Sequence, residues 1–98
     1  MACGAPGQEM KANEEVQTIV NEVKSQAEAK AGTTFDEFKA ISYRTQLVAG
    51  TNYFVKVKVG DLSYVHLRIY QTLPHAGSTL ELTAIKTELS EGDSLDYF

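Results

Sequence analysis

The sequence predicts an α+β fold in which an antiparallel β-sheet wraps around one long α-helix. Apolar residues within residues 13–31 recur with the spacing of an α-helix. After Gly32 the pattern changes, and apolar and polar residues alternate with a period of two in four segments. The links between those segments are too short to hold a crossover helix, so neighbouring strands should run antiparallel.

The predicted helix spans residues 13–31. Asn13 is suited to the N-cap position, and Gly32 is suited to the position after the last turn. One face of the helix carries five apolar residues at i, i+3, i+4, i+7 and i+11, namely Val16, Ile19, Val20, Val23 and Ala27. Because the sheet offers the only large apolar surface, we expect this apolar stripe to be the most buried part of the chain.

Four strands follow from the alternation, over residues 41–47, 53–59, 64–70 and 79–86. Each has one apolar face and one polar face, which is typical of a sheet with one side in solvent. On this pattern the side chains of Lys56, Lys58 and His66 lie on the solvent side, and we expect His66 to be exposed. The acidic segment after residue 89 is interpreted as a polar tail.

Two of the predicted links are unusually apolar. In an up-and-down meander, the tips after the first and third strands lie at one end of the sheet, whereas Gly60-Asp61 turns at the other end. Hairpin tips are normally polar, and clustered exposed apolar residues indicate a binding site. Leu47-Val48-Ala49 and Leu73-Pro74 depart from that rule. The alternative is that Leu47 and Val48 pack inward, and composition does not decide between the two.

Length and charge limit the functional classes. The 98 residues fit a single domain, residues 1–98, and carry 9 basic and 13 acidic side chains for a net charge of −4. Such a chain is a poor partner for nucleic acid or for an anionic membrane. A single cysteine, Cys3, cannot form an internal disulfide, and the first ten residues lack the features of a signal peptide. We expect the protein in the cytoplasm, with an additional nuclear location as an open alternative.

Catalytic and metal-binding patterns are missing from the sequence. Cys3 with His66 or His75 would be the only thiol–imidazole pairs, and Cys3 lies in a small-residue segment that nothing visibly holds. No spacing of histidines, cysteines or carboxylates matches a common metal site, and the glycines form no phosphate-binding motif. We therefore predict no enzyme activity, no cofactor and no metal.

Three segments resemble the cystatins, a family of inhibitors of papain-like cysteine proteases. Gln46-Leu47-Val48-Ala49-Gly50 is similar to the Gln-Val-Val-Ala-Gly motif of that family, with Leu47 where valine is usual. Leu73-Pro74-His75 and Gly4 match the second hairpin and the N-terminal glycine, in the same order along the chain. The lack of disulfides and of a signal peptide is typical of the type 1 branch, the stefins.

The resemblance implies the cystatin fold and a reversible, tight-binding inhibitor that occludes the cleft of cathepsin-type proteases. Its protease-binding residues would be Ala2, Cys3, Gly4, Gln46, Leu47, Val48, Ala49, Gly50, Leu73, Pro74 and His75. We expect a monomer, with exchange of the hairpin at residues 48–52 or a Cys3 disulfide as routes to a dimer. The alternative function is a small-ligand or protein-interaction module that uses the concave face of the same fold.

Overall fold

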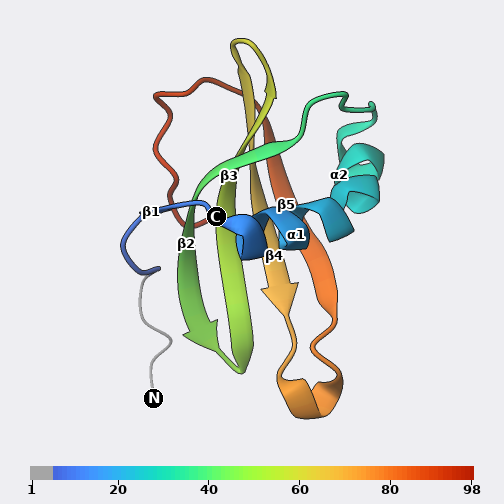
Figure 1. Ribbon diagram of the computed structural model, residues 1–98, viewed down its shortest axis with the longest axis vertical. Coiled ribbons are helices and arrows are strands. Elements are labelled where there is room, and N and C mark those ends of the chain that lie inside the picture. The colour runs from blue at the N-terminus through green and yellow to red at the C-terminus, as the bar shows by residue number, and fades with distance from the viewer. Residues whose placement is uncertain (1–5) are drawn as a thin grey trace.

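The computed structural model describes residues 6–98, and its five strands form one antiparallel sheet in the order β1-β2-β3-β4-β5 (Figure 1). The elements are β1 (Met10–Lys11), α1 (Glu14–Glu22), α2 (Lys24–Ala31), β2 (Lys39–Val48), β3 (Gly50–Gly60), β4 (Ser63–Gln71), η1 (Pro74–Ala76) and β5 (Leu80–Leu89). The α+β class and the meander of long strands are confirmed. The two-residue strand β1 was not predicted, because so short a segment shows no periodicity.

The helical segment begins and ends as predicted, but it is interrupted at Val23. Asn13 is the N-cap, its side-chain Oδ1 accepting a hydrogen bond of 2.9 Å from the Val16 amide, and Gly32 ends α2 with φ 75°. Val23 donates its amide to the carbonyl of Val20 at 3.2 Å, which is the tighter i→i−3 pattern. The expectation of one long helix is therefore wrong, since α2 continues in a new direction after this turn (Figure 1).

The apolar stripe of α1 and α2 is buried in the core, as predicted, but it is not the most buried part of the chain, because Val55, Leu67 and Ile69 of the sheet are 0 % exposed. Its five residues are at most 6 % exposed, and Val20, Val23 and Ala27 are fully buried. They pack against one face of the sheet, which contributes Tyr43, Val55, Val57, Val65, Leu67, Ile69 and Leu82. Within residues 6–98 neither helix has the length and apolar character needed to cross a bilayer.

Two glutamines connect the helices to the two outer long strands. Gln17 of α1 accepts from the amide of Ala40 at 2.8 Å and donates to the carbonyl of Phe38 at 3.0 Å. Gln26 of α2 accepts from the amide of Leu82 in β5 at 2.9 Å. A side-chain amide carries the same donor and acceptor as a peptide group. Gln17 and Gln26 therefore bond main-chain groups of the two outer long strands in the way that the main chain of a neighbouring strand would.

The opposite face of the sheet is covered by the C-terminal segment, residues 90–98. Phe54 is fully buried on this face, and its ring contacts those of Tyr97 and Phe98 at centroid distances of 5.5 and 5.9 Å. Leu95 is also buried, at 1 % exposure. Lys56 Nζ donates to the Glu91 carbonyl at 2.8 Å. The sheet is thus enclosed on both faces, by helices on one and by an extended segment on the other.

This covering overturns two expectations about the polar strand face. Lys56 is 8 % exposed and His66 only 2 %, whereas both were expected in solvent. Lys58 is half-buried, with its Nζ 3.8 Å from a carboxylate oxygen of Glu37. Alternation shows that a strand has a polar face but not what lies on it. The polar tail gave no sign that Leu95, Tyr97 and Phe98 would pack against the sheet.

Burial of His66 makes the stability of the fold depend on pH. Burial lowers the pKa of the His66 imidazole below its ordinary value, and the positive charges of Lys56 and Lys86 lower it further, against opposing effects of Asp93 and Glu9. The unfolded chain takes up a proton near pH 6.5. The stabilising contribution is therefore complete above about pH 6.5 and is lost as the pH falls towards the lower folded-state pKa.

We predict that the free energy of unfolding falls between about pH 7.5 and pH 5 and that His66→Gln flattens this dependence. Denaturant unfolding across the range measures both. His75 is exposed, so His75→Gln should follow the parent. An NMR titration of the His66 imidazole in the parent, whose pKa should lie below the ordinary histidine value of about 6.5, covers the case in which the His66 variant fails to fold. A His66 pKa at or above that value would contradict the prediction.

Candidate functional site

The two apolar tips predicted from the sequence lie at the same end of the sheet. The first tip, residues 46–50, joins β2 to β3, and Val48 pairs with Gly50 across it. The second tip, residues 73–75, leads into η1 between β4 and β5. Both are at the lower end in Figure 1, and the turn between β3 and β4 is at the upper end. The inference drawn from strand parity is confirmed.

The tips present apolar side chains to solvent. Leu47 is 75 % exposed and Leu73 39 % exposed. Ala49 and Pro74 are also exposed, and Val48 is half-buried. Inward packing of Leu47, the alternative left open by the sequence, is therefore wrong. Exposed apolar side chains gathered at one end of a small protein indicate a docking surface.

The first tip is supported from behind by polar contacts. Gln46 is 9 % exposed, and its Oε1 accepts from Asn52 Nδ2 at 3.0 Å across the hairpin. The hydroxyl of Tyr70 in β4 donates to the carbonyl of Ala49. Gly50 has φ 119°, a conformation that favours glycine, and lies directly against Tyr70 and Gln71. The tip is therefore held in one conformation by the neighbouring strand.

The second tip closes on itself. Thr72 and Thr79 face each other, with the Thr79 amide donating to Thr72 Oγ1 at 2.8 Å and the Thr72 amide to the Thr79 carbonyl at 3.0 Å. The carbonyl of Leu73 accepts from the amides of Ala76 and Ser78 at 2.9 and 3.2 Å. These bonds fix the backbone on both sides of Leu73. Its side chain and that of Pro74 are thereby presented on a closed loop.

The third predicted segment, Ala2, Cys3 and Gly4, lies outside the described residues. The structure does place the point at which the chain joins the fold. The Gly7 amide donates to the carbonyl of Thr45 in β2 at 2.7 Å, just before the first tip. Residues 6–7 therefore run beside the strand that carries the first tip.

The geometry of this end suits contact rather than chemistry. Both tips are apolar, and His75 is the only titratable side chain among residues 46–50 and 73–75. Across residues 6–98, no group of three His, Cys, Asp or Glu side chains is placed to hold a metal ion. The two tips together present exposed apolar side chains at one end of the sheet.

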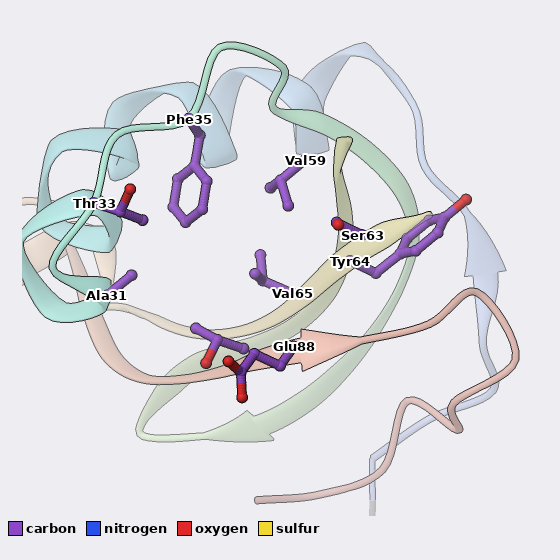
Figure 2. Close-up of a pocket in the computed structure, with 9 residues that line it drawn as sticks. Ala31, Thr33, Phe35, Val59, Ser63, Tyr64, Val65 and Glu88 are labelled. Atoms are coloured by element: carbon purple, nitrogen blue, oxygen red, sulfur yellow. The ribbon is translucent and has the colours of Figure 1, made fainter. Parts of the chain in front are cut away.

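A pocket lies at the other end of the sheet (Figure 2). It has a volume of about 280 Å³, and Phe35, Val59 and Val65 point into it, whereas the ring of Tyr64 points away. Its remaining lining comes from Ala31, Thr33, Ser63, Thr87 and Glu88. Among residues 6–98 the helices pack against the concave face of the sheet, and this pocket, far from both tips, is the place where a small ligand would fit.

Comparison with known proteins decides the family. The family profile described as Cystatin domain matches residues 4–89. The chain belongs to the cystatin family. Over 98 residues, the whole of both chains, it is 48 % identical to Cystatin-B from Homo sapiens and 49 % identical to Cystatin-B from Mus musculus and from Paralichthys olivaceus. The resemblance to the stefins predicted from the sequence is confirmed, since Cystatin-B is stefin B, and this cystatin is a cysteine protease inhibitor rather than an enzyme.

The contacts of Gly50 predict a cost for any side chain there. In Gly50→Ala, the new Cβ would lie 2.5 Å from the main-chain oxygen of Gln71 and 2.8 Å from the Tyr70 hydroxyl, at a positive φ. We expect a loss of at least about 1–3 kcal/mol in the free energy of unfolding, from backbone strain alone. Urea unfolding measures it. Gly92→Ala, with no atom within 4 Å, is the matched control and should change stability by less than about 0.5 kcal/mol. Equal stability of the two variants would show that the site tolerates a side chain.

Proposed function

We propose that this cystatin is a reversible, tight-binding inhibitor of papain-like, cathepsin-type proteases and that it fills their active-site cleft with three adjacent edges. These are the N-terminal edge (Ala2, Cys3 and Gly4), the first tip and the second tip. The observation that carries the proposal is the exposure of apolar side chains on both tips at the same end of the sheet. The protein would bind as a monomer in the cytoplasm.

Inhibition of this kind works by occlusion. Docking would remove Leu47, Ala49 and Leu73 from water, which favours binding in proportion to the apolar area buried. The tips are held by hydrogen bonds within the fold, so little conformational entropy is lost when they dock. An interface of standard size with preformed edges supports dissociation constants on the order of nanomolar or lower.

The N-terminal edge would contribute to binding because its residues are small. Gly4 has no Cβ, so its backbone can approach the catalytic thiol of the protease closely. Ala2 and Cys3 are small and apolar and would occupy neighbouring subsites on one side of the thiol. The first tip would lie on the other side, with Val48 and Ala49 in dry contact, and Pro74 and His75 would extend the second tip beside it.

A dimer is compatible with this proposal by two routes. The hairpin at residues 48–52 could open and exchange α1, α2, β1 and β2 between two copies, which would consume the first tip. A disulfide between two Cys3 thiols would instead block the N-terminal edge. Either dimer would therefore inhibit less well than the monomer.

The competing function, a small-ligand module, is favoured only by the pocket at the far end of the sheet. Titration of papain with the protein separates the two. Stoichiometric loss of protease activity supports the inhibitor. Retention of full activity with an equimolar or greater amount of folded protein would leave the family fold without the proposed function.

We predict that each edge contributes separately to inhibition. Gly4→Arg should weaken papain binding strongly, because a long charged side chain cannot lie against the groove. Val48→Asp should cost up to several kcal/mol of affinity by burying an unpaired charge. Leu73→Ala should cost roughly 1–2 kcal/mol by losing part of one buried side chain. Dissociation constants and melting temperatures of the variants measure these effects.

Leu62 provides the matched control for Leu73. It is 87 % exposed in the turn between β3 and β4, at the end away from both tips. Leu62→Ala should therefore inhibit like the parent. Inhibition at the parental level by folded Gly4→Arg and folded Val48→Asp would rule out the proposed edges, and an equal loss in Leu62→Ala would place the contact elsewhere.

We also predict that the Cys3 sulfur acts by contact and not by reaction. Cys3→Ser should keep papain inhibition with a modest loss of affinity, seen mainly as faster dissociation, because one apolar subsite contact becomes polar. Dissociation kinetics under reducing conditions measure the change. Complete loss of inhibition would show that the sulfur does more than fill an apolar subsite.

A further inference from the structure

The guanidinium of Arg44, in β2, joins the two ends of the described chain. Its Nε donates to the carbonyl of Gly7 at 2.7 Å, and its Nη2 donates to the carbonyl of Pro6 at 3.2 Å. Its third nitrogen, Nη1, donates to the carbonyl of Leu95 at 2.8 Å and lies 3.8 Å from a carboxylate oxygen of Asp96. Each nitrogen of one side chain is therefore engaged, two with the N-terminal residues and one with the C-terminal segment.

These contacts fix the direction in which the chain leaves the fold. Gly7 is bonded through both its amide, to Thr45, and its carbonyl, to Arg44. Pro6 is held through its carbonyl, and its own ring restricts φ. Without the guanidinium, a glycine bonded only through its amide would be free to act as a hinge. The planar, fixed spacing of guanidinium nitrogens allows one side chain to hold two successive carbonyls.

The guanidinium is itself held from the far side. Its side chain is 24 % exposed, so the bonds lie in a partly screened site. The Leu95 carbonyl accepts from Nη1, and Leu95 itself is only 1 % exposed. The acceptor therefore belongs to a buried residue of the C-terminal segment. The pair with Asp96 is a minor contribution, because that carboxylate is 70 % exposed and 3.8 Å away.

We propose that Arg44 is a positioning residue for protease inhibition. It holds Pro6 and Gly7 beside β2, just before the first tip, at the point where the chain continues into the N-terminal edge. This inference rests on the proposed function, in which the N-terminal edge enters the protease cleft. Its effect is preorganisation, since an edge already directed at the cleft loses less entropy on binding. Arg44 makes no contact with the protease in this account and acts only through residues 6–7.

A double-mutant cycle in the full-length chain tests the proposal. Arg44→Gln should weaken inhibition of papain about tenfold, through faster dissociation. In the Gly4→Arg background, where the N-terminal edge can no longer enter the cleft, Arg44→Gln should cause less than a twofold further loss. Arg44→Lys keeps the charge and the aliphatic stem, but its single nitrogen cannot replace the three separate nitrogens that bond Gly7, Pro6 and Leu95, so it should behave like Arg44→Gln. Arg44→Lys can also replace Arg44→Gln in the cycle if the glutamine variant folds poorly.

Arg68 provides the matched control. Its Nη1 donates to the main-chain oxygen of Phe98 at 2.8 Å and its guanidinium lies 5.1 Å from the centroid of the Tyr97 ring, so it also holds the C-terminal segment. It has no hydrogen bond to Pro6 or Gly7 among the described contacts. Arg68→Gln should lower the melting temperature and leave papain affinity within twofold of the parent.

The outcomes separate the two proposals. A parent chain that leaves papain active, or a Gly4→Arg variant that inhibits like the parent, would overturn the proposed N-terminal edge and with it the role of Arg44. If the parent chain and Gly4→Arg both behave as expected, the remaining measurements test the positioning role of Arg44 alone. Equal losses from Arg44→Gln in the two backgrounds, or parental inhibition by Arg44→Gln and Arg44→Lys, would overturn it.

Discussion

The burial of the apolar stripe of α1 and α2 against one face of the sheet is the contact on which the rest of the structure depends. Val20, Val23 and Ala27 are fully buried there, and the long strands bring Val55, Val57 and Leu67 to the same core. Because the helices fill this face, the strands are free to extend beyond the core at one end. The two tips are those extensions, and their apolar side chains remain exposed because α1 and α2 do not extend to that end of the sheet (Figure 1).

Enclosure of the second face changes how the polar side of the sheet should be understood. Lys56 and Arg68 hold the C-terminal segment through its main-chain oxygens, while Phe54 packs against Tyr97 and Phe98. The basic side chains of this face therefore serve as attachment points within the molecule. Arg44 belongs to the same set, but it alone also reaches residues 6–7. The covering of the sheet is in this way linked to the base of the N-terminal edge.

The sequence was sufficient for the main features that depend on periodicity and capping. Helix spacing identified the stripe, Asn13 and Gly32 marked the helix ends, and hairpin parity placed the two tips together. It was insufficient where a contact joins distant residues. Burial of His66 depends on the C-terminal segment, which lies more than twenty residues later in the chain. The hydrogen bonds of Arg44 are accepted by main-chain carbonyls, and because every residue carries a carbonyl, the sequence does not mark these acceptors. The interruption at Val23 left no breaker residue to detect.

The glutamines that bond the sheet's margins also bear on association between copies. A strand edge with unpaired amides and carbonyls is a template for another chain, and native proteins keep such edges covered. Here Gln17 occupies the main chain around Ala40 in β2, beyond the part of that strand that pairs with β1, and Gln26 occupies the amide of Leu82 in β5. Both contacts are made by side chains of the helices. Undocking of the helices would therefore free main-chain groups on both outer long strands at once while leaving the strands paired. Pairing of these freed groups with a second copy should accordingly follow loss of helix docking and not loss of the sheet.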